Sequence, residues 1–406
     1  MTESATNYGD ILKEWRDRNG FELSDLAGMV GLGNDQLVAI EEGREEPTFE
    51  LLRKFSSVTG LELEYFDPEL DDAPESRPEV ATLLKSETRN INTVAFPPIF
   101  EATEIAHQIT QVEQWQEKPN RFESIRRDFQ GFDPNDSNQR DWEQGEALAG
   151  RVRENLDLGL EPIDSVYRLA LEIGVAVIEV RLPEANFTAM ALADEYHGPA
   201  IILNLASKAE SVLPRRFAVA HELCHILFDR NDLQPVKQFD REVGFFEDQR
   251  KPSVERRADA FAINLLCPHE RFLEYWDETA RPGKPDEVRI QEMIRHFGVG
   301  LEATLGHLKS VSVLSDSDVR NLGHIPPDNL VDFEERFWPH VAFDDRACLN
   351  ALTLPRRGLL LNEVIAAYDH HAIGRSKVLE FLDISGNAFE EHIAEWEMLA
   401  RDYSVA

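Results

Sequence analysis

The chain has 406 residues, 42% of them apolar and 29% charged, a balance typical of globular proteins with roughly two to four domains at this length. Acidic residues outnumber basic residues by 76 to 42, and the formal charge of -34 excludes a surface that binds nucleic acid over most of its area. We find no stretch of about 18 apolar residues and no leader of the secretory type, so we expect a cytoplasmic protein without membrane contact.

The cysteines are too few and too scattered for a disulfide framework or a cysteine-ligated zinc site. We expect Cys224, Cys267 and Cys348 to be small, buried and reduced. Cys224 lies inside the principal motif described below, which leaves redox sensing as a second interpretation for that thiol.

The N-terminal region, residues 8–66, is predicted to form short helices, two of them separated by the turn Gly31-Leu32-Gly33. The first begins at Ser24. The apolar residues that support the two helices are Leu26, Ala27, Val30, Leu37 and Ile40. This pattern resembles the helix-turn-helix domain of Cro/cI (Xre) type, including the segment 41–44 and Pro47.

The charge of this region leaves its partner open. Residues 1–66 contain 14 acidic and 6 basic side chains, a balance of 6 − 14 = −8. Asn34, Asp35 and Gln36 occupy the positions expected to meet base edges, and DNA binding also requires a local basic patch. The candidates for that patch are Arg16, Arg18, Arg44, Arg53 and Lys54. The alternative is a docking module that pairs with another repressor of the same fold.

A linker and helical region is expected over residues 67–141. Residues 67–80 are acidic and proline-rich, which predicts a linker. Residues 81–130 look helical in part, with Pro97 and Pro98 interrupting the pattern. The turn-rich stretch 130–139 marks the next boundary.

The central region, residues 142–310, is predicted to combine helices with a small antiparallel sheet. Helices are expected near 145–157 and 163–173, followed by a buried strand from Val175 to Val180. The apolar runs 188–193 and 200–205 flank a turn and predict a hairpin, whose second strand presents an open edge to an extended peptide. Because helices dominate again afterwards, the fold class is α+β.

The sequence His221-Glu222-Leu223-Cys224-His225 predicts a metal site. Residues i and i+4 share one face of a helix, so His221 and His225 can hold the same ion. Glu222 lies about 100° round the helix, where a carboxylate can take a proton from a water acidified by zinc. The alternative is a pair of ordinary helix histidines.

A second helix, from Ser253 towards Pro268, supplies a third ligand. Its apolar stripe consists of Val254, Ala258, Phe261 and Leu265. Glu255 and Asp259 border that stripe one turn apart, which places one carboxylate to bind zinc and the other to accept a histidine N–H. Otherwise these two carboxylates are solvated charges beside Arg256 and Arg257.

Three segments together resemble the ImmA/IrrE family of metallopeptidases over roughly residues 142–310. They are Ile202-Leu203-Asn204, Arg216 to His225, and Glu255 to Pro268. The resemblance implies a gluzincin-like fold with one zinc held by His221, His225 and Glu255, with Glu222 as base and Asp259 supporting a ligand. It also implies cytoplasmic cleavage of Cro/cI-type repressors in responses to stress or mobile elements. Cys224 departs from the small residue of many members.

The C-terminal region, residues 311–406, is predicted to be helical and acidic. Residues 354–357 begin a helix carrying Leu360, Val364 and Ala367, and residues 373–384 form a short helix and turn. We expect packing or dimerisation here rather than a second DNA reader.

The sequence as a whole predicts a zinc-dependent regulatory endopeptidase fused to a helix-turn-helix domain. The competing hypothesis is a transcription regulator whose zinc domain senses a ligand without hydrolysis. Glu222 favours the enzyme, because a pure sensor has no chemical need for that carboxylate. A component of a toxin–antitoxin or phage-defence system is a third interpretation.

Overall fold

The computed structural model describes residues 8–18, 21–59, 96–129, 139–183, 187–229, 236–240, 253–325, 336–338 and 346–404. The predicted linker 67–80 lies outside these residues, as does most of the turn-rich stretch 130–139. Among the described helices, none is both long and apolar enough to cross a bilayer.

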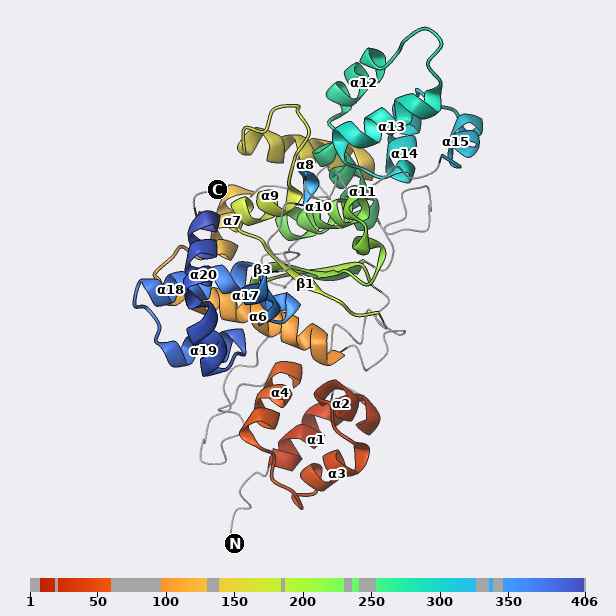
Figure 1. The fold of residues 1–406 in the computed structure, drawn as a ribbon. Helices are drawn as coiled ribbons and strands as arrows, with labels where there is room; N and C mark the ends of the chain where they lie inside the picture. The colour runs from red at the N-terminus through yellow and green to blue at the C-terminus, as the bar shows by residue number, and fades with distance from the viewer. Residues whose placement is uncertain are drawn as a thin grey trace.

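The N-terminal region forms the predicted helix-turn-helix (Figure 1). Its helices are α1 (Tyr8–Arg18), α2 (Leu23–Val30), α3 (Asn34–Glu41) and α4 (Phe49–Thr59). Helix α2 begins one residue before the predicted Ser24, because Glu22 and Asp25 form a capping box at its start. Gly31 ends α2 with φ of 75°, a left-handed conformation that glycine adopts without steric cost.

A four-stranded sheet of order β1-β3-β2-β4 lies at the centre of the molecule. The strands are β1 (Ala176–Val180), β2 (Ala189–Asp194), β3 (Gly198–Asn204) and β4 (Val236–Asp240). The predicted β2–β3 hairpin is confirmed, with Ala189 opposite Leu203.

The prediction of an antiparallel sheet was wrong in one pairing, because β1 runs parallel to β3. The chain reverses between β1 and β2 and again between β2 and β3, so β3 regains the direction of β1 and pairs beside it. The expectation of an open edge at residues 200–205 was also wrong, since β3 has neighbours on both sides. Among the strands that the structure describes, β1 and β4 lie at the edges of the sheet.

Alternate residues of the strands enter two separate cores. One face contributes Val177, Ala189, Ala191, Ala193, Ile201 and Leu203 to the core formed with α9 (Val166–Ile173) and α10 (Val212–Phe228). The other face contributes Ala176, Ile178, Val180, Met190, Leu192, Ala200 and Ile202 to a core shared with α6 (Phe96–Trp115) and the C-terminal helices. We call the first the metal face, after the predicted ligands on α10, and the second the regulatory face, after the helix-turn-helix whose residues share its core.

The metal face is covered by α10, packed between the sheet and the crossing pair α8 (Asp141–Asn155) and α11 (Ser253–Leu266). Gly145 permits this crossing, because a Cβ there would lie 2.3 Å from the backbone oxygen of Arg257. Beyond α11 the chain forms α12 (His269–Glu278), α13 (Asp286–Phe297), α14 (Leu301–Ser310) and α15 (Asp316–Leu322), which extend away from the sheet (Figure 1).

The regulatory face is covered by α6 and by the C-terminal helices α17 (Ala347–Asn350), α18 (Leu359–Asp369), α19 (Arg375–Leu382) and α20 (Gly386–Ser404). Pro97 and Pro98 lie in the first turn of α6 and do not interrupt it, because a first turn needs no N–H donors. The predicted Leu360, Val364 and Ala367 are buried. Helices α2 and α4 contact α6, so the helix-turn-helix shares this core.

Candidate metal centre

Helix α10 carries His221, Glu222 and His225 into the interior of the metal face. The two histidine side chains and Glu222 are 0–1% exposed. Buried apolar residues precede and follow them on the same helix, namely Phe217 to Ala220 before His221 and Ile226 to Phe228 after His225. The apolar residues therefore fix this helix between the sheet and α11, and the i, i+4 spacing sets both imidazoles on one side of it.

Glu255 of α11 completes a group of three residues that could hold a metal ion, two histidines and one glutamate. The ring atoms Nε2 of His221 and His225 lie 3.1 Å apart, and Glu255 places its carboxylate oxygens 3.3 Å and 3.7 Å from them respectively. One ligand atom from each residue lies within 4.8 Å of the other two. The structure thus brings together the three residues that the sequence predicted, although Glu255 lies 30 residues after His225 and on a different helix.

The outer nitrogens of both imidazoles face carboxylates. His225 Nδ1 donates to Asp229 Oδ2 at 2.7 Å, and His221 Nδ1 lies 3.1 Å from Asp259 Oδ1. Because a carboxylate accepts, this arrangement favours the proton on Nδ1 and leaves the lone pair on Nε2 in each neutral ring. Two lone pairs 3.1 Å apart repel unless a cation lies between them.

The donor set fits zinc. Two nitrogens that bind one tetrahedral zinc at about 2.1 Å are about 3.4 Å apart, close to the separation observed. Two imidazoles and one carboxylate are also the ligands of many catalytic zinc sites, which keep a fourth position open. The predicted alternative of ordinary helix histidines does not account for their convergence with Glu255.

Sequence reasoning missed Asp229, the residue after α10. Its carboxylate is 5% exposed and also pairs with Arg257 of α11, whose Nη1 donates to Gln144 of α8 at 3.4 Å. The sequence does place this acidic residue four positions after His225, the spacing of one helical turn. That spacing was not used because Asp229 follows the last residue of the helix, where the backbone direction decides whether it can reach the ring.

Cys224 lies on the same helix and is fully buried. Burial raises the pKa of its thiol well above the usual value, and the nearby Asp229 carboxylate raises it further. The neutral thiol is therefore strongly favoured, in agreement with a packing role.

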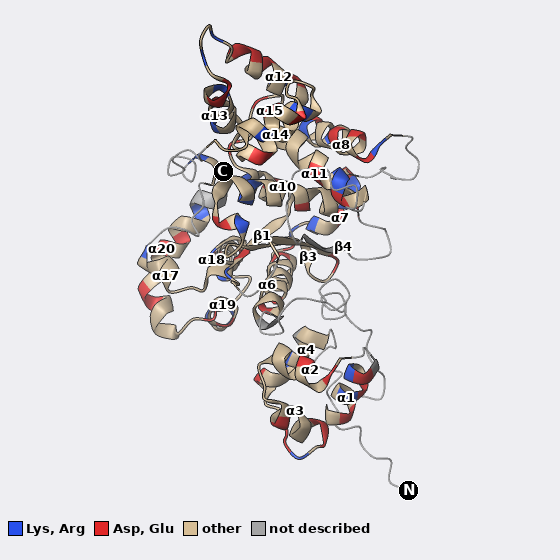
Figure 2. Cartoon of the chain, turned by 90° about the vertical axis from the view of Figure 1, so that its right-hand side faces the viewer, with Lys and Arg blue, Asp and Glu red and all other residues tan. Residues whose placement is uncertain are grey.

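The helix-turn-helix carries its predicted contact residues on the outside of α3. Asn34, Asp35 and Gln36 are exposed. Gln36 donates to Glu45 at 3.2 Å, and Arg44 donates to Glu42 at 2.7 Å. Figure 2 shows acidic residues, coloured red, along α3 and in the turn that follows it.

The candidates for a basic patch do not form one exposed group: Arg16 and Arg44 lie near the end of α3 but are paired with acidic residues, and the others lie elsewhere. Arg16 donates twice to Glu41, at 2.7 Å and 3.0 Å. Arg53 and Lys54 lie on α4 and line a cavity on the side of α6. The side chain of Arg18 lies outside the described residues.

Fold and site together define a peptidase-type metal domain joined to a helix-turn-helix domain. Residues 170–309 match the model of the peptidase family M78, the IrrE N-terminal-like domain, and residues 12–66 match a helix-turn-helix model. The central domain is therefore similar to this peptidase family, and a helix-turn-helix domain of Cro/cI type precedes it. A search of curated proteins gives no match.

Proposed function

We propose that this protein is a cytoplasmic, zinc-dependent endopeptidase that acts on a regulatory protein. His221, His225 and Glu255 would hold the metal. The observation that carries the proposal is the pair of Nε2 atoms 3.1 Å apart, each in a ring whose other nitrogen faces a carboxylate. Zinc, when bound, supplies Lewis acidity that polarises a peptide carbonyl and acidifies a water.

Glu222 is assigned as general base. It follows His221 on α10 and is fully buried beside the ligand group, and a carboxylate so placed takes a proton from the attacking water and returns it to the leaving amine. Asp259 and Asp229 keep the imidazoles in the tautomer that leaves Nε2 available. The match to a peptidase family supports hydrolysis over the alternative of a non-hydrolytic zinc sensor.

The edge strand β4 is the proposed binding strand for an extended substrate. Helix α10 contacts β4 as well as β2, so a peptide added to that edge would run close to the metal helix. Backbone hydrogen bonds to an edge strand hold the peptide in one register without reading its sequence.

The substrate proposed is a repressor of Cro/cI type in a stress or mobile-element response, as the family resemblance implies. The helix-turn-helix would act beside it as a DNA reader through Asn34, Gln36 and Arg44, or as a module that docks the repressor. Its acidic surroundings weaken phosphate binding and so favour the docking role. We therefore expect any DNA affinity to depend only weakly on salt, because few phosphates would be contacted.

The test compares new protein N-termini in stressed cells that express the wild type or Glu222→Gln. We expect at least one terminus that requires Glu222 and lies inside a repressor. If both strains give the same termini while the variant retains zinc, the sensor hypothesis replaces the peptidase.

A further inference from the structure

The C-terminal helices repeat the arrangement of the N-terminal helix-turn-helix. Helices α2 and α19 both have 8 residues, and each is followed by a three-residue turn before α3 or α20. The first turn residue is left-handed in both, with φ of 75° at Gly31 and 52° at Asp383. These two positions differ by 383 − 31 = 352, and the same offset relates the rest of the motif.

The repeat extends to hydrogen bonds and burial. The N–H of Leu32 donates to the oxygen of Ala27 at 2.8 Å, and that of Ile384 to the oxygen of Leu379 at 3.1 Å. Buried residues at the 352-residue offset are Leu26 and Val378, Met29 and Phe381, Val30 and Leu382, Leu37 and Phe389, Ile40 and His392. The short helix and turn predicted at residues 373–384 therefore belong to a second helix-turn-helix unit, formed by α18, α19 and α20.

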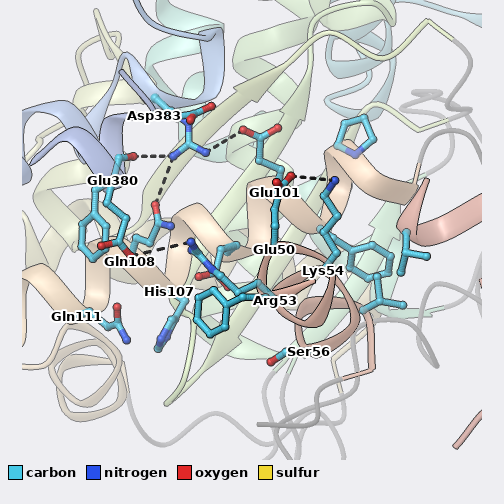
Figure 3. Close-up of a pocket in the computed structure, with 18 of the residues that line it drawn as sticks. Glu50, Arg53, Lys54, Ser56, Glu101, His107, Gln108, Gln111, Glu380 and Asp383 are labelled. Atoms are coloured by element: carbon cyan, nitrogen blue, oxygen red, sulfur yellow. Dashed lines mark hydrogen bonds and ion pairs between the residues drawn. The ribbon is translucent and has the colours of Figure 1, made fainter. Parts of the chain in front are cut away.

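A cavity of about 720 Å³ lies between the two units and α6 (Figure 3). Corresponding positions of the repeat line it, Met29 and Gly31 from the first unit and Phe381 and Asp383 from the second. Its size lies within the range of small-molecule sites, and its apolar lining includes Phe100 of α6.

Four cationic side chains reach the cavity from three parts of the chain. Arg53 and Lys54 come from the first unit, Lys377 from the second, and Arg356 from the segment before α18. Carboxylates line it as well, namely Glu50, Glu101, Glu104, Glu380 and Asp383. The ion pair between Arg53 and Glu380 joins the two units across the cavity at 4.0 Å, the long limit for such a pair.

Arg356 is the residue that favours a negatively charged ligand in this cavity. The residue is 8% exposed, and its guanidinium donates to the oxygen of Phe381 at 2.6 Å and to Glu101 at 3.0 Å. Its Nε is the one buried polar atom without a hydrogen-bond partner among the described residues that line the cavity. Glu101 is already paired with Arg356, and Glu380 with Arg53 and Lys377. These carboxylates therefore need no cationic ligand, whereas the buried Nε of Arg356 has no acceptor.

We propose that this cavity binds a small anion, a carboxylate or a phosphate, that carries an apolar ring. The anionic group would accept from Arg356 and lie between Arg53 and Lys377, and the ring would pack on Met29, Phe100 and Phe381. Since Arg53 and Lys377 belong to different units, the bound anion would bridge the two helix-turn-helix units and stabilise their contact. This site is independent of the proposed zinc chemistry.

The experiment measures binding of four probes to the full-length protein by ligand-observed NMR. Phenyl phosphate and phenylacetate carry the ring and either anion, inorganic phosphate lacks the ring, and 2-phenylethanol lacks the charge. We expect one of the two ring-bearing anions to bind at least ten-fold more tightly than either incomplete probe. The identity of that anion distinguishes a phosphate site from a carboxylate site.

Substitutions of two lining residues test whether the probe binds in this cavity. Arg356→Met and, at a 44% exposed position that tolerates substitution, Lys377→Gln should each weaken the preferred probe about ten-fold. Arg357→Met is the matched control, because Arg357 lies outside the cavity lining. The bound probe should also slow amide exchange in α4 and α19. Equal binding of 2-phenylethanol, binding unchanged by Lys377→Gln, or no binding would each overturn the proposal.

Discussion

The two faces of the sheet are built from the same strands but pack against different kinds of structure. On the metal face, polar groups are buried and held by several contacts each. Arg216, for example, is fully buried and donates to the backbone oxygens of Gly298, Asp164 and Ile163 at 2.6–3.0 Å. On the regulatory face, an apolar core continues from the strands through α6 into two helix-turn-helix units, and a large cavity remains between them.

The two faces differ in how firmly their contacts are fixed. The proposed metal ligands lie on helices α10 and α11, whose separation is fixed by close packing and by the series of contacts Gln144–Arg257–Asp229–His225. The helix-turn-helix is joined to the second unit across the cavity by a long, half-exposed ion pair. The proposed metal chemistry needs fixed distances between ligands, and its residues lie on the tightly packed face. The contacts between the two helix-turn-helix units, which a bound ligand could alter, lie on the other face.

The largest effect is expected from Glu255→Ala. The substitution removes one of the three ligands and leaves two imidazole lone pairs, so we expect zinc affinity to fall by more than about 100-fold. Competition with a chromogenic chelator measures it. Lys377→Gln on the regulatory face is the control that should leave zinc affinity unchanged, and an unchanged affinity in Glu255→Ala itself would refute the third ligand.

Asp229→Asn should lower zinc affinity by about 10- to 100-fold. The amide keeps the shape of the side chain but lacks the charge that orients His225 and neutralises the buried Arg257. Asp229→Glu should recover part of the affinity, which a purely structural defect would not allow. The same chelator competition applies, and wild-type affinity in Asp229→Asn would remove this residue from the site.

Gly145→Ala tests the packing of the metal face. Its Cβ would lie 2.3 Å from a backbone oxygen of α11, so we expect a loss of about 2 kcal/mol in the free energy of unfolding. Gly150→Ala, on the same helix with nothing within 4 Å, should be neutral or stabilising by about 0.5–1 kcal/mol. Denaturant titration measures both, and equal values would show that the α8–α11 crossing is not tight.

A smaller effect concerns pH. His307 is fully buried, and burial lowers its pKa from 6.5 to about 3. Below pH 6.5 the unfolded chain takes up a proton at this residue that the folded chain does not, so its contribution destabilises the fold as the pH falls towards 3. Between pH 6.5 and 5 this contribution is about 1.5 kcal/mol. His307→Gln should reduce the loss of unfolding free energy between pH 6.5 and 5 by about that amount, measured by denaturant titration at both pH values, and an unchanged loss would contradict it.

The sequence predicted the residues whose roles depend on local spacing. His221 and His225 are one helical turn apart, and Glu255 borders an apolar stripe, so periodicity alone placed them. The pairing of β1 with β3 was missed because it joins segments about 24 residues apart, and nothing local distinguishes it from a simple meander. The repeat in residues 359–404 was missed because its identity rests on burial and on the left-handed Asp383, which sequence letters do not show.

The most direct test of the account is an anomalous difference map at the zinc edge from crystals grown with zinc. The account predicts one strong peak about 2.1 Å from Nε2 of both His221 and His225, with a Glu255 oxygen as the third ligand. A peak at another place, or none at this group in fully zinc-loaded crystals, would contradict it.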